Sequence, residues 1–71
     1  MYFYVQIREK GNLLWKAMRD NGKILVFKNN DKALNYVKKQ GENITHKIVN
    51  LLYHPSHKRS RIYGKKVIIK E

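Results

Sequence analysis

The dipeptide Asn21-Gly22 constrains the fold of this chain more than any other feature, because it lies between two short runs that contain apolar residues. Asn-Gly is the preferred sequence of the two-residue turn whose twist matches that of paired strands, since both residues tolerate positive φ. The pattern therefore predicts a β-hairpin formed by residues 13–19 and 23–28.

A further strand is predicted before this hairpin, because apolar residues recur at every second position, at Phe3, Val5 and Ile7. Residues 10–12 (Lys-Gly-Asn) are typical of a turn that separates it from the hairpin. Together, the three strands predict an antiparallel meander over residues 2–28.

A short helix is predicted at about residues 31–40. The preceding Asn-Asn-Asp sequence provides an N-cap and a carboxylate in the first turn, where the helix dipole favours negative charge. Ala33, Leu34 and Val37 follow at helical spacing, and Gly41 lies where helices commonly end. This narrow apolar stripe predicts that the helix packs across one face of the meander.

Two more strands are predicted in the second half of the chain. Residues 44–53 are rich in β-branched side chains, which favour a strand. The spacing of Ile44, Ile48 and Leu51 also fits a helical stripe, so a helix is the alternative here. Residues 67–69 form a final strand, after a long loop or a mobile hairpin tip. The predicted class is α+β: a small antiparallel sheet in the order β-β-β-α-β-β, with one short helix packed on one face.

Length and composition limit residues 1–71 to a single small domain. A chain this short buries only about 60% of its unfolded surface, which predicts a stability of a few kcal/mol. Since there is no cysteine, no disulfide compensates for the small core. The longest apolar run, residues 24–27, is too short to cross a membrane, and the N-terminus lacks the pattern of a signal peptide. A soluble cytoplasmic protein is therefore expected.

Positive charge is the main indication of a partner. Sixteen Lys and Arg residues face five Asp and Glu residues, which gives a formal net charge of +11. Such an excess destabilises a folded monomer by self-repulsion unless an anionic partner neutralises it. The charge is densest from Lys58 to Lys66, where no acidic residue interrupts it. We name the loop that contains this run, residues 54–66, the basic segment.

The basic segment is predicted to bind the phosphates of a nucleic acid. Lys and Arg displace counterions from a phosphate backbone, Arg can hold one phosphate with two hydrogen bonds, and a Tyr ring offers a face for base stacking. The predicted nucleic-acid-binding residues are Lys58, Arg59, Arg61, Tyr63, Lys65 and Lys66, supported by Arg19, Lys23 and Lys28 on the meander. The alternative is a solvated surface loop in a lysine-rich protein.

Tyr2 and Tyr4 give a second indication of the same kind. If Phe3 faces the helix, both tyrosines face the other side of the sheet, beside Arg8. A bare sheet face with tyrosines and basic residues would offer stacking platforms for bases. Alternatively, the two rings cover the second half of the fold.

The histidines and carboxylates do not form a recognisable metal or catalytic site. His54 and His57 lack a third ligand and lie among basic residues that repel a cation, so neither a metal nor another cofactor is predicted. The acidic residues show no paired spacing. The remaining catalytic alternative is a metal-independent ribonuclease toxin, in which these histidines act as base and acid and nearby cations stabilise the transition state.

Part of the first half resembles a known DNA-binding module. The order of Trp15-Lys16-Ala17, Gly22 and residues 27–36 (FKNNDKALNY) is similar to that in the N-terminal arm-type DNA-binding domains of phage and transposon integrases. In that family, a three-stranded sheet lies in the DNA major groove, with a helix behind it. The resemblance covers about residues 2–40, whereas residues 44–71 depart from the family by adding two strands and the basic segment. It implies that the DNA-facing residues are Lys16, Arg19, Lys23 and Lys28.

These features predict a small non-enzymatic nucleic-acid-binding protein without base readout, either a monomer or a homodimer formed at an open edge strand. The abundance of residues with A/T-rich codons is typical of a low-GC bacterium, its phage or a mobile element. The alternative is therefore a phage or mobile-element effector that binds an acidic host protein and inhibits or redirects it. The same cations would then meet carboxylates, with Trp15, Tyr2 and Tyr4 as interface anchors.

Overall fold

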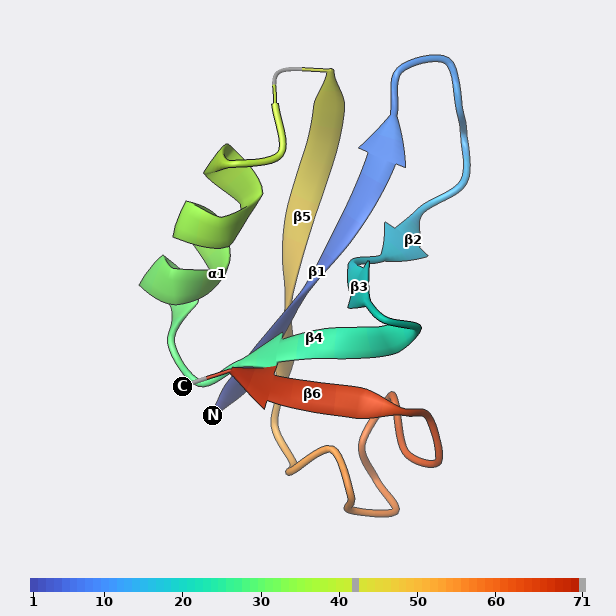
Figure 1. Cartoon of the computed structure of the whole chain (residues 1–71). Helices are drawn as coiled ribbons and strands as arrows, with labels where there is room; N and C mark the ends of the chain where they lie inside the picture. Colours follow the sequence, from blue (N-terminus) through green and yellow to red (C-terminus); the bar gives the residue numbers. More distant parts are fainter. Residues whose placement is uncertain (42, 71) are drawn as a thin grey trace.

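The computed structural model describes residues 1–41 and 43–70, in which one helix lies on a six-stranded sheet. The predicted α+β class is confirmed (Figure 1). At the predicted turn, Asn21 and Gly22 have φ angles of 53° and 79°, as the two-residue hairpin requires. This turn joins β3 (Arg19–Asp20) to β4 (Lys23–Phe27), and the two strands pair antiparallel.

The predicted middle strand of the meander is divided into two short strands, which pair with different partners, β1 (Tyr2–Glu9) and β4. The start of β1 pairs with the end of β4, but farther along β2 (Lys16–Ala17) pairs with β1, whereas β3 pairs with β4. Met18 lies between these two short strands. Its amide donates to the Val5 carbonyl at 2.8 Å, and its carbonyl accepts from the Leu25 amide at 3.0 Å. The chain therefore passes from one strand partner to the other at Met18.

The prediction of a continuous strand over residues 13–19 is wrong at its start. The Asn12 amide donates to the Glu9 carbonyl at 3.0 Å, and the Asn12 side chain accepts from the Leu14 amide at 2.9 Å. An Asn side chain that binds the backbone two residues ahead favours a turn over a strand. Leu13 and Leu14 are consequently 86% and 70% exposed, and pairing begins only at Lys16.

α1 (Asn30–Lys38) begins at the predicted cap. The Asn29 side chain accepts a hydrogen bond from the Asp31 amide at 2.7 Å. Ala33 and Val37 are buried against one face of the sheet, as their spacing predicted. The other buried residues of this core are Val5, Met18, Leu25 and Phe27.

Residues 44–51 form β5 (Ile44–Leu51), so the strand interpretation is confirmed and the helical one is wrong. β5 pairs antiparallel with β1 along its whole length. β6 (Val67–Lys70) pairs with β4 and not with β5, and this pairing is parallel in an otherwise antiparallel sheet. Since β4 and β5 are both antiparallel to β1 and β6 is parallel to β4, β5 and β6 run in the same direction. The basic segment that joins them is therefore a crossover connection and not the tip of a hairpin. Within the described residues, no helix is long and apolar enough to span a membrane.

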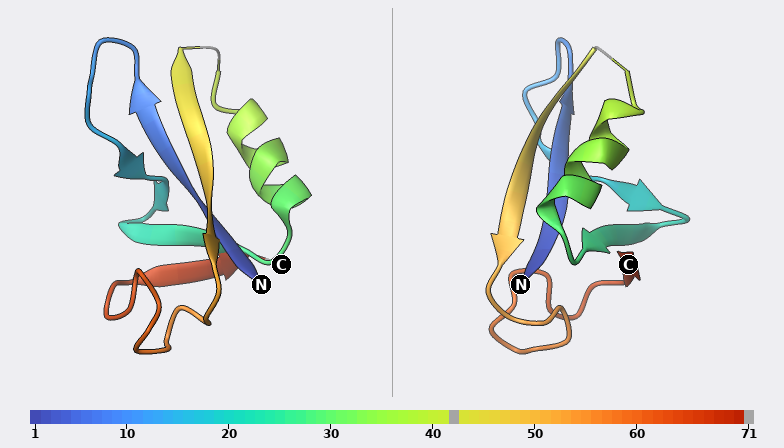
Figure 2. Two further views of the ribbon diagram at one scale, coloured as in Figure 1. Left: turned by 180° about the vertical axis from the view of Figure 1, so that it is seen from behind. Right: turned by 90° about the vertical axis from the view of Figure 1, so that its left-hand side faces the viewer.

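Apolar side chains fill both faces of the sheet. α1 covers one face, and Ile62 of the basic segment packs on the other. The basic segment lies at the end of the molecule away from the loop of residues 10–15 (Figure 2). Tyr4 lies on the face away from the helix, as predicted, but only 6% of it is exposed because Ile62 of the basic segment packs into the same core. The prediction of a bare sheet face with stacking tyrosines is therefore wrong. The buried residues of this second core are Tyr4, Ile24, Val26, Leu51 and Ile62.

Candidate nucleic-acid interface

Successive turns fold the basic segment into a compact unit. The amides of His57, Ser60 and Tyr63 each donate to the carbonyl three residues earlier, at 2.8, 2.9 and 3.2 Å. Pro55 and Ile62 are buried, and Ser60 is only 9% exposed. The sequence predicted a long loop or a mobile hairpin tip here, but the burial of Pro55 and Ile62 packs the segment on the sheet, since an isolated turn would leave their apolar surface in water.

The basic segment and the middle strand of the meander line a groove of about 390 Å³. Of the residues that the structure describes, ten line this groove, four of them are basic and none is acidic. Tyr4 and Trp15 contribute apolar surface to the lining. The four basic residues, which we name the groove cations, are Lys16 and Arg19 from β2 and β3, and Arg61 and Lys65 from the basic segment.

The groove cations reinforce one another as a site for an anion. Several like charges around one concavity focus the positive potential, so the local concentration of anions rises. Arg19 is also held in place, since its Nη1 donates to the Gly22 carbonyl at 3.0 Å. Its guanidinium retains further donors for a phosphate or a carboxylate.

Two more cations, Arg8 and Lys47, contact the ring of Trp15 beside the groove. The Arg8 guanidinium carbon and the Lys47 ammonium lie 4.9 and 4.5 Å from the Trp15 ring centroid, within the range of cation–π interactions. With two cations over the ring, Trp15 organises positive charge and is not an open platform for a base. Sequence reasoning missed Lys47, which is paired with Gln6 across the β1–β5 register and therefore faces the same side as Arg8.

We expect Trp15→Leu to lower the free energy of unfolding by about 1 kcal/mol, because the substitution keeps an apolar side chain but removes the two cation–π interactions. Loss of a fully buried Trp would cost about 3 kcal/mol or more. Urea denaturation followed by circular dichroism separates the two values. A loss of the larger size would contradict the half-buried position of this ring.

The structure brings only part of the predicted residue set together. Arg19, Arg61 and Lys65 line the groove. Four predicted residues of the basic segment are exposed but lie outside the lining: Lys58, Arg59, Tyr63 and Lys66. Lys23 and Lys28 are exposed near the two ends of β4, also outside it. Charge density along the sequence therefore located the basic segment but not the side chains that face the groove.

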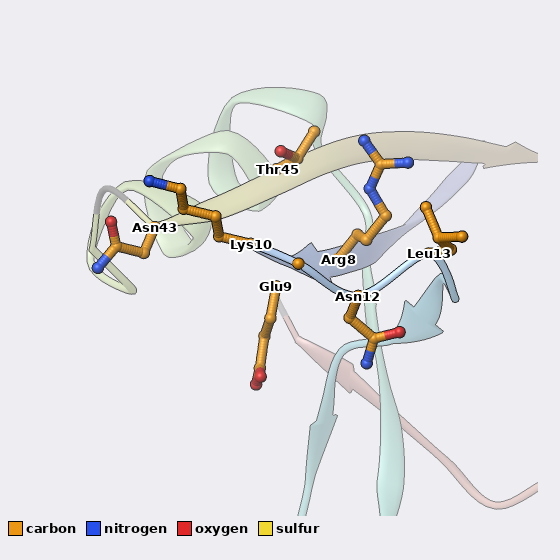
Figure 3. A pocket seen from close by; sticks show the side chains of 8 residues that line it. Arg8, Glu9, Lys10, Asn12, Leu13, Asn43 and Thr45 are labelled. Carbon is orange, nitrogen blue, oxygen red and sulfur yellow. The ribbon is translucent and has the colours of Figure 1, made fainter.

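A second hollow, of about 470 Å³, lies at the tip of the β1–β5 ribbon (Figure 3). We name it the tip hollow; Arg8, Leu13 and Thr45 are among the residues that line it. Arg8 and Glu9 extend to opposite sides of β1 (Figure 3). Arg8 also lies over Trp15, which lines the groove, so the positive charge continues from the groove to the tip.

The histidines of the basic segment hold its turns. His54 Nδ1 accepts from the Ser56 amide at 3.1 Å and lies 2.7 Å from the Ser56 hydroxyl, while His57 Nδ1 accepts from the Arg59 amide at 3.1 Å. His57 also stacks on Tyr53, with centroids 4.7 Å apart. In a neutral ring, an accepting Nδ1 leaves the proton on Nε2. Within residues 1–41 and 43–70, no three His, Cys, Asp or Glu side chains are grouped as a metal site would need.

No protein-family model, curated protein or solved structure matches this chain. The resemblance of residues 2–40 to integrase arm-type domains therefore stays a prediction. Any functional assignment must be argued from the groove and its surroundings.

Proposed function

We propose that this chain is a small non-enzymatic protein that binds nucleic acid by holding its phosphates in the groove. One observation carries the proposal: cations from two parts of the chain more than forty residues apart line the same groove, without an acidic residue among its described lining. Self-repulsion disfavours this clustering in a free monomer, and a bound polyanion relieves it.

The groove is suited to a phosphate backbone in size and chemistry. Its volume of about 390 Å³ is within the range of small-molecule sites, so one phosphodiester unit with its sugar can enter. Arg19 and Arg61 supply paired donors, and Lys16 and Lys65 add point charges. Because phosphates are the same at every nucleotide, we expect affinity to depend weakly on sequence and steeply on salt.

The groove, and not the sheet face, is the proposed contact with nucleic acid, because this face of the sheet is covered. In the integrase arrangement, a bare sheet face enters DNA. Here the basic segment packs on that face through Ile62, and the groove forms at its border with β2 and β3. Lys16 and Arg19, which the resemblance placed against DNA, remain candidate contacts in this arrangement.

The binding role is favoured over ribonuclease activity by the hydrogen bonds of the histidines. A general base needs a free lone pair on a ring nitrogen within reach of the proton that it removes. In His54 and His57, the Nδ1 lone pair already accepts a backbone amide. We therefore assign both residues to the structure of the basic segment.

An acidic host protein is the alternative partner, because Arg and Lys bind carboxylates as well as phosphates. Nucleic acid is favoured by the continuation of the positive charge from the groove cations to Arg8 and Lys47 beside Trp15. An extended row of cations matches the regular spacing of charge along a polyanion.

Fluorescence anisotropy with labelled single- and double-stranded oligonucleotides tests the proposal. We expect saturable binding that weakens about a hundredfold between about 50 and 200 mM salt, as four neutralised phosphates predict. A labelled poly-glutamate peptide serves as the polyanion control and should bind more weakly. Absence of oligonucleotide binding at the lower salt concentration would refute the proposal. Capture of one stoichiometric acidic protein from a lysate would then support the effector alternative.

A further inference from the structure

Two adjacent leucines project into solvent beside the proposed phosphate track. Leu13 is 86% exposed and Leu14 is 70% exposed, and the only other leucine among the exposed large hydrophobic residues described is Leu52, at 75%. A single exposed leucine is common, but two consecutive ones on a small protein indicate a contact surface.

The leucines are held in position by the loop that carries them. The Asn12 side chain accepts from the Leu14 amide, and the Asn12 amide donates to the Glu9 carbonyl. Trp15, the next residue along the chain, is fixed by its contacts with Arg8 and Lys47. The backbone that carries Leu13 and Leu14 is therefore fixed by hydrogen bonds on one side and by the contacts of Trp15 on the other.

Basic residues flank the leucine pair. Leu13 lines the tip hollow together with Arg8, Lys10 and Glu9, and Glu9 extends to the side of β1 opposite Arg8 (Figure 3). Leu14 directly precedes Trp15 and Lys16, both of which line the groove. An apolar tip beside Arg8 and Lys16 complements a polyanion whose apolar parts lie just inside its charged surface. Stacked bases behind a phosphate backbone have this arrangement.

The two aromatic rings that line the groove, Tyr4 and Trp15, do not suit a single strand. Proteins that bind single strands stack successive bases on open aromatic faces. Tyr4 is only 6% exposed, and two cations lie over Trp15. Leucine is instead one of the side chains that minor-groove proteins insert between base pairs, which unstacks one step and bends the duplex.

A membrane surface fits less well. Anionic lipids would attract the same cations, but a bilayer presents a nearly flat plane of headgroups. Arg61 and Lys65 line a concave groove that a plane cannot enter. A duplex backbone is a ridge, so it can enter the groove while the neighbouring bases meet the leucines.

We propose that Leu13 and Leu14 form a wedge that enters the minor groove of duplex DNA and opens one base step, while the groove cations hold the adjacent phosphates. This inference rests on the proposed function, and it specifies the nucleic acid as a duplex that is bent on binding. Flexible pyrimidine–purine steps should be preferred, because they are the least costly to unstack.

The double variant Leu13→Ser/Leu14→Ser tests the wedge. Leu52→Ser is the control, because it removes an exposed leucine that also lies beside cations, Arg59 and Arg61, but is not part of the loop that carries Leu13 and Leu14. The probe is a duplex of about 20 base pairs that carries 2-aminopurine at a central TA step and dyes at its ends. We expect the natural protein to raise the 2-aminopurine emission and to shorten the end-to-end distance. The double variant should lose both signals and bind the duplex about tenfold more weakly, while its affinity for the single strand stays within about twofold.

The outcomes separate this inference from the proposed function. If the natural protein binds the duplex but the double variant binds and bends it equally well, the wedge is refuted and the phosphate groove stands. If the natural protein binds neither strand form at low salt, the proposed function itself fails. If leucine-dependent binding is seen with vesicles of phosphatidylserine and phosphatidylcholine but not with the duplex, a membrane contact replaces the wedge.

Discussion

Replacing Arg19, Arg61 and Lys65 with Gln should lower the slope of log affinity against log salt by about 2.7 units on duplex DNA, because each lost phosphate contact removes about 0.9. These residues line one groove, so the loss should also weaken binding by about two to three orders of magnitude at about 0.1 M salt. Anisotropy titrations at four or five salt concentrations give both values. We expect no loss of thermal stability, since the substitutions reduce repulsion between like charges.

The matched control removes the same amount of charge from the opposite side of the molecule. Lys32, Lys38 and Lys39 are exposed on or just after α1, which covers the other face of the sheet. Their replacement with Gln leaves the same net charge as the groove variant, so long-range attraction falls equally. If the two triple variants lose the same affinity, binding depends on net charge alone and the groove is not a site.

Ile62→Ala should lower the free energy of unfolding by about 3 kcal/mol, because removing a buried isoleucine loses its transfer free energy and leaves a cavity. Ile62 is 4% exposed and packs in the core with Tyr4 and Leu51. Ile62 also lines the groove together with Arg61, so its removal should make this side of the groove less rigid. Urea denaturation at constant pH measures the change.

Tyr63→Ala is the control for this substitution. Tyr63 is the next residue along the chain but is 51% exposed, and we expect its removal to cost less than about 1 kcal/mol. Equal losses for the two variants would mean that the basic segment is not anchored through Ile62. A small loss for both would contradict the close packing of the segment on the sheet.

Features that depend on neighbouring residues were predictable from the sequence. The Asn21-Gly22 turn follows from the positive φ that both residues adopt, and the start of α1 follows from the capping side chain of Asn29. The alternation of apolar residues in β1 correctly predicted that Tyr4 and Val5 face opposite sides of the sheet. In each case, the information lies within a few residues.

Features that depend on long-range pairing were not predictable. The β-branched residues of β6 favour a strand but do not select its partner. In the structure β6 lies beside β4, where Val67 and Ile69 pack against the core that contains Ile62. The spacing of charges along residues 54–66 does not reveal that Arg61 and Lys65 face Arg19 across a groove. Lys47 meets Trp15 only because the β1–β5 register places it there.

Mapping of amide chemical shifts by NMR, with a short DNA duplex added to the labelled protein, tests the central claim most directly. The account predicts that the largest shifts occur in residues 13–19 and 61–65, the two segments that carry the groove cations and the two exposed leucines. Residues 32–39, on the helix that covers the other face, should change little. Shifts concentrated on the helix, or spread evenly over all exposed lysines, would contradict a phosphate-binding groove.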